Sequence, residues 1–222
     1  MPAFRRAVVL LIGVVYGSAV ATAQAPVAVV EEVESLSAGV EFMDYLTPGQ
    51  IIRLSPGDAM VIGYMHSCWR ENIQGGTVTV GSEQSSVDGG TLERTKIRCN
   101  GGQMRLATEQ AEKSGALSFR RAVGKSPSPQ RTVYSLSPII EVTAPGKLII
   151  ERTDKPGERY EIDVTAAKLL RGAFFDLGQE GVMLAADGLY RVKTTSADLI
   201  IKIAPDAQRD GVPVIARLVR QP

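Results

Sequence analysis

The sequence predicts a mainly β protein of two small β modules, the second sandwich-like, with at most one or two short helices in the mature chain. Three observations carry this prediction. Apolar and polar residues alternate over short stretches, as in strands that bury one face. Glycine, proline, aspartate and asparagine recur between these stretches, where turns require them. Only residues 107–115 are rich in helix formers, and they predict one or two helical turns.

The first 23 residues have the layout of a secretory signal peptide. Arg5 and Arg6 form a short basic region, residues 7–17 are uncharged and apolar, and small residues follow in an A-x-A pattern. The apolar run is too short for a membrane span, which needs about 20 residues. We therefore expect a periplasmic or secreted protein cleaved after Ala23. An uncleaved anchor helix is the alternative.

Charge and length limit what the mature chain does. Without the two signal-peptide arginines it would keep 23 basic and 24 acidic side chains over 199 residues. It has no basic surplus that would bind nucleic acid, and no later segment is apolar enough to span a membrane. A chain of this length buries one sizeable core or two smaller ones. We expect a soluble protein whose partner is another envelope or extracellular protein.

The N-terminal module, residues 30–123, shows the alternation most clearly. A stretch at 57–68 would place every second residue on one face, namely Met60, Ile62, Tyr64, His66 and Cys68. Val78 and Val80 would share the buried face of a further strand. Gly-Gly pairs predict turns at 75–76, 89–90 and 101–102.

A linker rich in glycine, serine and proline at 124–131 precedes the C-terminal module, residues 132–222. There, residues 138–164 predict two or three strands joined by Pro-Gly turns, and 165–172 a helical turn. Residues 181–194 predict a hairpin closed at Asp187-Gly188. The last strands are expected at 198–205 and 212–220, with Pro213 at an edge or a strand start. About seven short strands at this spacing favour a sandwich.

Residues 63–72 hold the one histidine, the one tryptophan and one of the two cysteines. A nucleophilic Cys68 would need His66 as its base, but side chains two apart on a strand lie about 6–7 Å apart. A metal site would combine His66, Cys68, Cys99 and Glu71, whereas structural zinc sites use four Cys or His ligands at short spacings. A redox pair would show C-x-x-C, which is absent.

We therefore favour a disulfide between Cys68 and Cys99, each at the end of a predicted strand. Closing a loop of about 30 residues would stabilise the fold by about 3–4 kcal/mol in the chain-entropy model. Trp69 would then pack beside the bridge, and His66 would be a hydrogen-bonded strand residue or a pH sensor. The candidate binding residues are His66, Trp69, Arg70 and Glu71.

Other catalytic patterns are missing. The chain has no G-x-S-x-G elbow, P-loop, H-E-x-x-H or calcium-loop pattern. Asp44, Asp88 and Glu93 resemble solvated turn carboxylates more than a glycosidase pair, and only 5% of the residues are aromatic. We expect no catalytic residue, no metal and no cofactor.

Residues 39–68 resemble the β domains of FecR-like periplasmic proteins, through a Leu-x-x-Gly-x-x-Ile element at Leu46, Gly49 and Ile52. Gln50 replaces the usual acid, and the family's later Thr-Gly and Asp-Gly-Ser signals are missing. This resemblance implies envelope sensing or scaffolding. The C-terminal half is similar to immunoglobulin-like accessory domains in architecture only, which does not define a function.

These observations together predict an exported, non-catalytic protein that mediates protein–protein interaction or sensing in the cell envelope. Two alternatives remain, a carbohydrate- or surface-binding module and a cysteine-dependent enzyme that uses Cys68 and His66. The sequence does not identify a small-molecule ligand.

Overall fold

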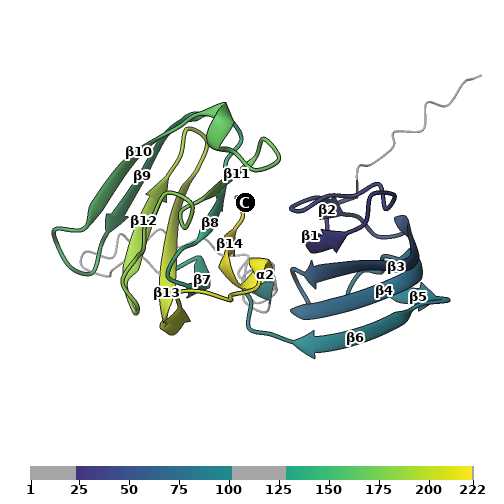
Figure 1. Cartoon of the computed structure of the whole chain (residues 1–222). Helices are drawn as coiled ribbons and strands as arrows, with labels where there is room; N and C mark the ends of the chain where they lie inside the picture. Colours follow the sequence, from purple (N-terminus) through teal and green to yellow (C-terminus); the bar gives the residue numbers. More distant parts are fainter. Residues whose placement is uncertain (1–23, 102–128, 222) are drawn as a thin grey trace, which may run out of the picture.

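The computed structural model describes residues 24–101 and 129–221, which form a mainly β fold of three sheets, one of them curled into a half-barrel (Figure 1). The first sheet has strand order β2-β1-β3-β4-β5, and β6 also pairs with β4. Its strands all come from the N-terminal half: β1 (Ala28–Glu34), β2 (Tyr45–Leu46), β3 (Ile51–Tyr64), β4 (Trp69–Thr79), β5 (Ser86–Asp88) and β6 (Thr91–Lys96).

The C-terminal half forms the other two sheets, with strand orders β10-β9-β12-β13-β7 and β11-β8-β14. Their strands are β7 (Arg131–Ser135), β8 (Ile139–Glu141), β9 (Gly146–Arg152), β10 (Arg159–Val164), β11 (Phe174–Asp176), β12 (Leu189–Lys193), β13 (Asp198–Gln208) and β14 (Leu218–Val219). A 3-10 turn, η1 (Ala166–Lys168), follows β10, and the one-turn helix α2 (Val214–Arg217) precedes β14. Figure 1 shows α2 between the two halves.

In the long strand β3 the predicted inner face is confirmed, although Val61 and Gly63 between its members are buried as well. Met60, Ile62 and Tyr64 are buried in the core of the N-terminal half. The strand ends at Tyr64, however, so His66 and Cys68 lie in the turn before β4 instead of on the strand. The backbone cause is local, because Cys68 has a φ of 57°, which is incompatible with an extended strand.

Three further expectations are wrong. Gly75-Gly76 makes no turn between strands but an irregularity inside β4, where both glycines have positive φ. Asp187-Gly188 forms a turn in front of β12, and no strand precedes it to complete a hairpin. The predicted strand at 212–220 instead begins with Pro213 and α2, and only its last part pairs, as β14 with β8.

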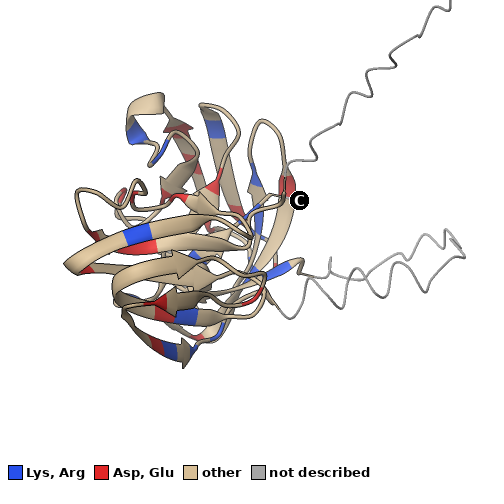
Figure 2. Cartoon of the chain, turned by 90° about the vertical axis from the view of Figure 1, so that its right-hand side faces the viewer, with Lys and Arg blue, Asp and Glu red and all other residues tan. Residues whose placement is uncertain are grey.

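Several predictions for the C-terminal half are confirmed. β9 and β10 form an antiparallel pair, and η1 supplies the expected helical turn. Along β10, Val164 is buried and its alternate neighbours are half-buried, while the charged residues between them are exposed. Figure 2 shows acidic and basic residues interspersed along the ribbon, which agrees with the nearly balanced charge.

Three expectations lie outside the described residues: the signal peptide at 1–23 with its cleavage after Ala23, the helical turns at 107–115, and residues 124–128 of the linker. Among the described residues, no helix has the length and apolar character needed to cross a membrane.

Each half has its own apolar core, and a third buried cluster joins them. The joining cluster contains residues from both halves, namely Val29, Met43, Met65, Ile139, Phe174, Val214, Ile215 and Leu218. The rings of Tyr45 and Phe174 meet edge to face with centroids 5.2 Å apart. The Tyr45 hydroxyl donates to a carboxylate oxygen of Glu141 at 3.1 Å. The two halves are therefore packed against each other.

Candidate functional site

The cysteine pair of the conspicuous segment 63–72 is a disulfide. The Sγ atoms of Cys68 and Cys99 lie 2.05 Å apart, with the Cα atoms 5.6 Å apart. The bridge ties the turn after β3 to the chain just beyond β6. While it is intact, Cys68 has no thiolate to offer, so the nucleophilic and metal-binding roles considered for this residue have no chemical basis in this structure.

His66 and Trp69 lie beside this bridge. The backbone of His66 packs so closely against Gly101 that a Cβ on the glycine would lie 2.1 Å from the carbonyl oxygen of His66. Trp69 begins β4 and packs against the N-terminal core, and the Lys96 ammonium lies 4.8 Å from its ring centroid. The two residues therefore lie on either side of Cys68 in the chain, one in the turn and one at the start of β4.

Glu71 points into the N-terminal half. Its side chain is fully buried, and one carboxylate oxygen accepts a 2.6 Å bond from Nε of Arg94. The same carboxylate accepts from the backbone N–H of Ser85 at 3.1 Å, and the Ser85 hydroxyl lies 2.8 Å from that of Tyr64. A buried carboxylate with these bonds fixes the loop between β4 and β5.

Arg70, one of the candidate binding residues, faces a cavity. Alternation along β4 places it opposite to Glu71, at the boundary with the C-terminal half. Its guanidinium donates to Glu31 at 2.7 Å and to Glu32 at 2.8 Å. These residues form one wall of a groove of about 760 Å³ between the two halves.

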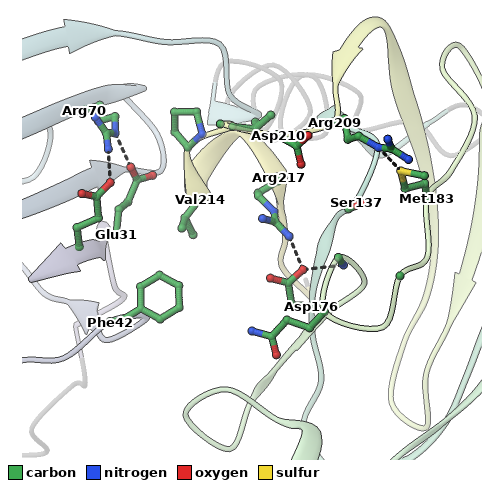
Figure 3. A pocket seen from close by; sticks show the side chains of 17 residues that line it. Glu31, Phe42, Arg70, Ser137, Asp176, Met183, Arg209, Asp210, Val214 and Arg217 are labelled. Atoms are coloured by element: carbon green, nitrogen blue, oxygen red, sulfur yellow. Dashed lines mark hydrogen bonds and ion pairs between the residues drawn. The ribbon is translucent and has the colours of Figure 1, made fainter.

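The groove takes its opposite wall from the C-terminal half (Figure 3). That wall consists of the β11–β12 loop, the β13–α2 loop and α2 itself. Its side chains include Asp176, Met183, Arg209, Asp210 and Arg217, and Ser137 contributes from the segment before β8. A bond between Arg217 and Asp176 crosses this wall, and Asp176 also accepts from the backbone N–H of Gly178 at 2.9 Å. The groove thus has a preformed hydrogen-bonded lining.

Glu31 connects the two walls. It is 4% exposed, and besides Arg70 it accepts a 2.9 Å bond from the backbone N–H of Ile215 in α2. Burial raises the pKa of Glu31, and the bonds from Ile215 and Arg70 only partly oppose this. Gly63 allows the close approach, because a Cβ there would lie 2.5 Å from Cγ2 of Ile215 and 2.8 Å from Oε1 of Glu31.

Apolar side chains also open into the groove. Phe42 is 39% exposed and Met183 is 37% exposed, and they extend from opposite walls (Figure 3). Only four large hydrophobic side chains are exposed among the described residues, and these are two of them. Exposed apolar groups that gather at one cavity mark an interaction site more strongly than scattered ones do.

Sequence reasoning found Arg70 and missed the rest of the groove. Its residues come from β1, from the segment before β2 and from three places in the C-terminal half, so no short motif contains them. The available signal was compositional: "RDGVPV", residues 209–214, joins two charges to Gly211 and Pro213, which indicates a constrained loop.

No family model matches this sequence, and neither a curated protein nor a solved structure is significantly similar to it. Over the described ranges 24–101 and 129–221, no three His, Cys, Asp or Glu side chains lie together in a way that could hold a metal ion. The site must therefore be interpreted from its own geometry.

Proposed function

We propose that this is an exported, non-catalytic protein that binds a protein partner of the cell envelope or the extracellular space in the groove between its halves. The observation that carries the proposal is the groove itself, with Phe42 and Met183 exposed on opposite walls and several charged groups around them. A mixed apolar and polar lining is typical of protein recognition sites, which combine a small apolar centre with polar surroundings.

The packing between the halves supports a preformed site. Apolar contacts, the Tyr45–Glu141 hydrogen bond and the bond from Ile215 to Glu31 hold the two walls together. A partner that binds a preformed groove loses less free energy to ordering than one that must assemble its site. The FecR-like resemblance of residues 39–68, carried by Leu46, Gly49 and Ile52, also favours a sensing or scaffolding role.

The immunoglobulin-like arrangement of the C-terminal half and the carbohydrate-binding alternative are also proposals. An immunoglobulin-like arrangement of the C-terminal half would require its five-stranded and three-stranded sheets to pack face to face as a sandwich. The carbohydrate alternative would use Trp69 as a stacking platform, but this ring is half-buried and covered by Lys96. Quenching of its fluorescence by glycans would favour that alternative.

The proposal is tested by affinity capture from the native envelope with three immobilised forms of the mature protein: wild type, Phe42→Ser and Leu36→Ser. Leu36 is the matched control, because it is fully exposed and does not line the groove. We expect a protein retained by wild type and by Leu36→Ser and lost with Phe42→Ser. The same retained proteins on all three forms, or none on wild type, would contradict the proposal.

A further inference from the structure

The charged residues of the groove are not all paired. Seven charged side chains line it: Glu31, Glu32, Arg70, Asp176, Arg209, Asp210 and Arg217. Arg70 bonds to the two glutamates, and Arg217 bonds to Asp176. Within the described part of the chain, Arg209 and Asp210 have no partner of opposite charge. The groove therefore offers one cation and one anion to a ligand, although its formal charges nearly cancel.

Arg209 is placed to receive a carboxylate. Its Nε donates to the Sδ atom of Met183 at 2.9 Å, and a thioether is a weak acceptor. A carboxylate would accept two parallel bonds from the guanidinium, which are stronger and better oriented. Arg217 lies on the same wall, and its Nε is buried without an acceptor among the described residues, so Asp176 alone balances its charge. This wall favours an anionic group beside Met183.

One apolar group of the groove, Met183, lies next to this cation. Met183, the residue that Arg209 contacts, faces the groove from one wall, and Phe42 faces it from the other (Figure 3). Methionine adapts to the shape of an apolar partner, and a phenylalanine ring offers a flat contact surface. An apolar ligand side chain that enters the groove from the Phe42 side and packs on Met183 would place its neighbouring group next to Arg209.

Asp210 offers a hydrogen-bond acceptor to a ligand in the groove. Asp210 is exposed and lines the groove from the same wall as Arg209 (Figure 3). An extended peptide presents a main-chain N–H at every residue except proline, and such an N–H would satisfy this acceptor. A lipid or a simple organic acid offers the carboxylate and the apolar group but lacks this regular series of donors.

We propose that the groove recognises an extended peptide segment with a carboxylate next to an apolar side chain. The carboxylate bonds Arg209, the apolar side chain lies between Phe42 and Met183, and a main-chain N–H donates to Asp210. This inference rests on the proposed function and specifies its ligand. The carboxylate belongs either to an aspartate or glutamate side chain or to the C-terminus of the partner.

Fluorescence anisotropy with labelled pentapeptides tests this recognition. The probes are blocked glycine–serine peptides that contain Leu-Asp, Leu-Asn, Leu-Lys or Ser-Asp, and one unblocked peptide that ends in Leu with a free carboxylate. They are titrated with the mature protein in its wild-type form and as Arg209→Gln, Phe42→Ser and Arg191→Gln. Arg191 is the control, because it is an equally exposed arginine that is paired with Asp198 and does not line the groove.

We expect the wild-type protein to bind a carboxylate probe, either Leu-Asp or the free C-terminal Leu, at least about tenfold more tightly than Leu-Asn. Whichever of these two probes binds identifies the source of the carboxylate. Arg209→Gln should bring this ratio close to one, Phe42→Ser should weaken Leu-Asp binding to the level of Ser-Asp, and Arg191→Gln should change neither.

The inference is overturned if no carboxylate probe binds the wild-type protein, if Leu-Lys binds as tightly as the carboxylate probe that binds best, or if the ratio survives Arg209→Gln. These failures are separable from failure of the proposed function. Groove-dependent capture of a partner without carboxylate selectivity would refute the ligand chemistry and leave the binding function intact.

Discussion

The two halves of the molecule stabilise themselves differently. The N-terminal half has one sheet, a buried cluster of 12 residues, a disulfide and an ion pair between the buried Glu71 and Arg94. The C-terminal half has two sheets and a buried cluster of 15 residues, and both cysteines of the sequence lie outside it. A smaller core yields less hydrophobic free energy, and a covalent link supplements it. The groove lies where the cross-linked half meets the one that depends on packing.

The largest expected change in stability comes from a substitution that breaks the packing of the C-terminal half. Phe175 is fully buried in its core, so Phe175→Ala should lower the free energy of unfolding by about 3–5 kcal/mol through lost burial and a cavity. Urea unfolding of the mature protein with its disulfide intact measures this change. Leu36→Ala, at an exposed site, is the control and should change little. A loss under about 1 kcal/mol for Phe175→Ala would show that this half does not depend on its core.

The second largest change in stability is expected when the cross-link of the N-terminal half is removed. The double substitution Cys68→Ser and Cys99→Ser should cost about 3–4 kcal/mol, because the open loop gains chain entropy when it unfolds. Hydrogen exchange should show lost protection of backbone amides in β3 and β4, while those in β9 and β12 keep theirs.

Reduction of the wild-type protein should reproduce the exchange pattern of this double variant. Equal loss of protection in both halves would contradict the contrast between them, because the disulfide would then stabilise the whole molecule and not one half.

The third expected change in stability tests the contact between the halves. Gly63→Ala should cost about 1–3 kcal/mol, because the new methyl group would collide with Ile215 and Glu31. Ile215→Ala should therefore destabilise the Gly63→Ala protein less than it destabilises the wild type. A double-mutant cycle from urea unfolding measures this coupling. Additive effects would mean that the two residues do not touch in solution.

The smallest effect concerns the pH dependence at the same contact. The pKa of Glu31 is raised above its usual 4.5, so the folded state holds this proton more tightly than the unfolded state does. The stability that Glu31 contributes is thus fully present below about pH 4.5 and is lost as the pH rises through the folded-state pKa. Wild type should therefore gain stability relative to Glu31→Gln as the pH falls from 8 to 4.

Urea unfolding of both forms at each pH measures that difference. A difference that stays constant across the range would show that the Glu31 pKa is the same in the folded and unfolded states. A difference of the opposite sign would mean that the Arg70 pair outweighs burial.

Local patterns predicted much of each half. Alternation located the buried face of β3 at Met60, Ile62 and Tyr64, and the scarcity and spacing of the cysteines predicted the disulfide. The pattern failed where long-range contacts or backbone angles override it. Gly75-Gly76 has the composition of a turn, but Gly76 pairs with Leu54 of β3, and β4 continues on either side through its pairs with β6 and β5.

The contact between the halves was harder to predict, for the same physical reason. Met65, the first residue after β3, is also buried because the C-terminal half covers it, and one sequence cannot show which surface covers a side chain. The groove depends on that contact. Arg70 and Arg209 line one cavity, but no sequence periodicity relates residues so far apart.

The central claim is that binding occurs in the groove and that the cysteine-containing turn is structural. It is tested most directly by mapping backbone amide NMR shifts of the mature protein during titration with the peptide probe that it binds most tightly. We predict that shift changes gather at Phe42, Gly181, Arg209 and Gly211, and that the amides of His66 and Trp69 stay unchanged. Changes centred on His66 and Trp69, with the groove amides silent, would contradict the account.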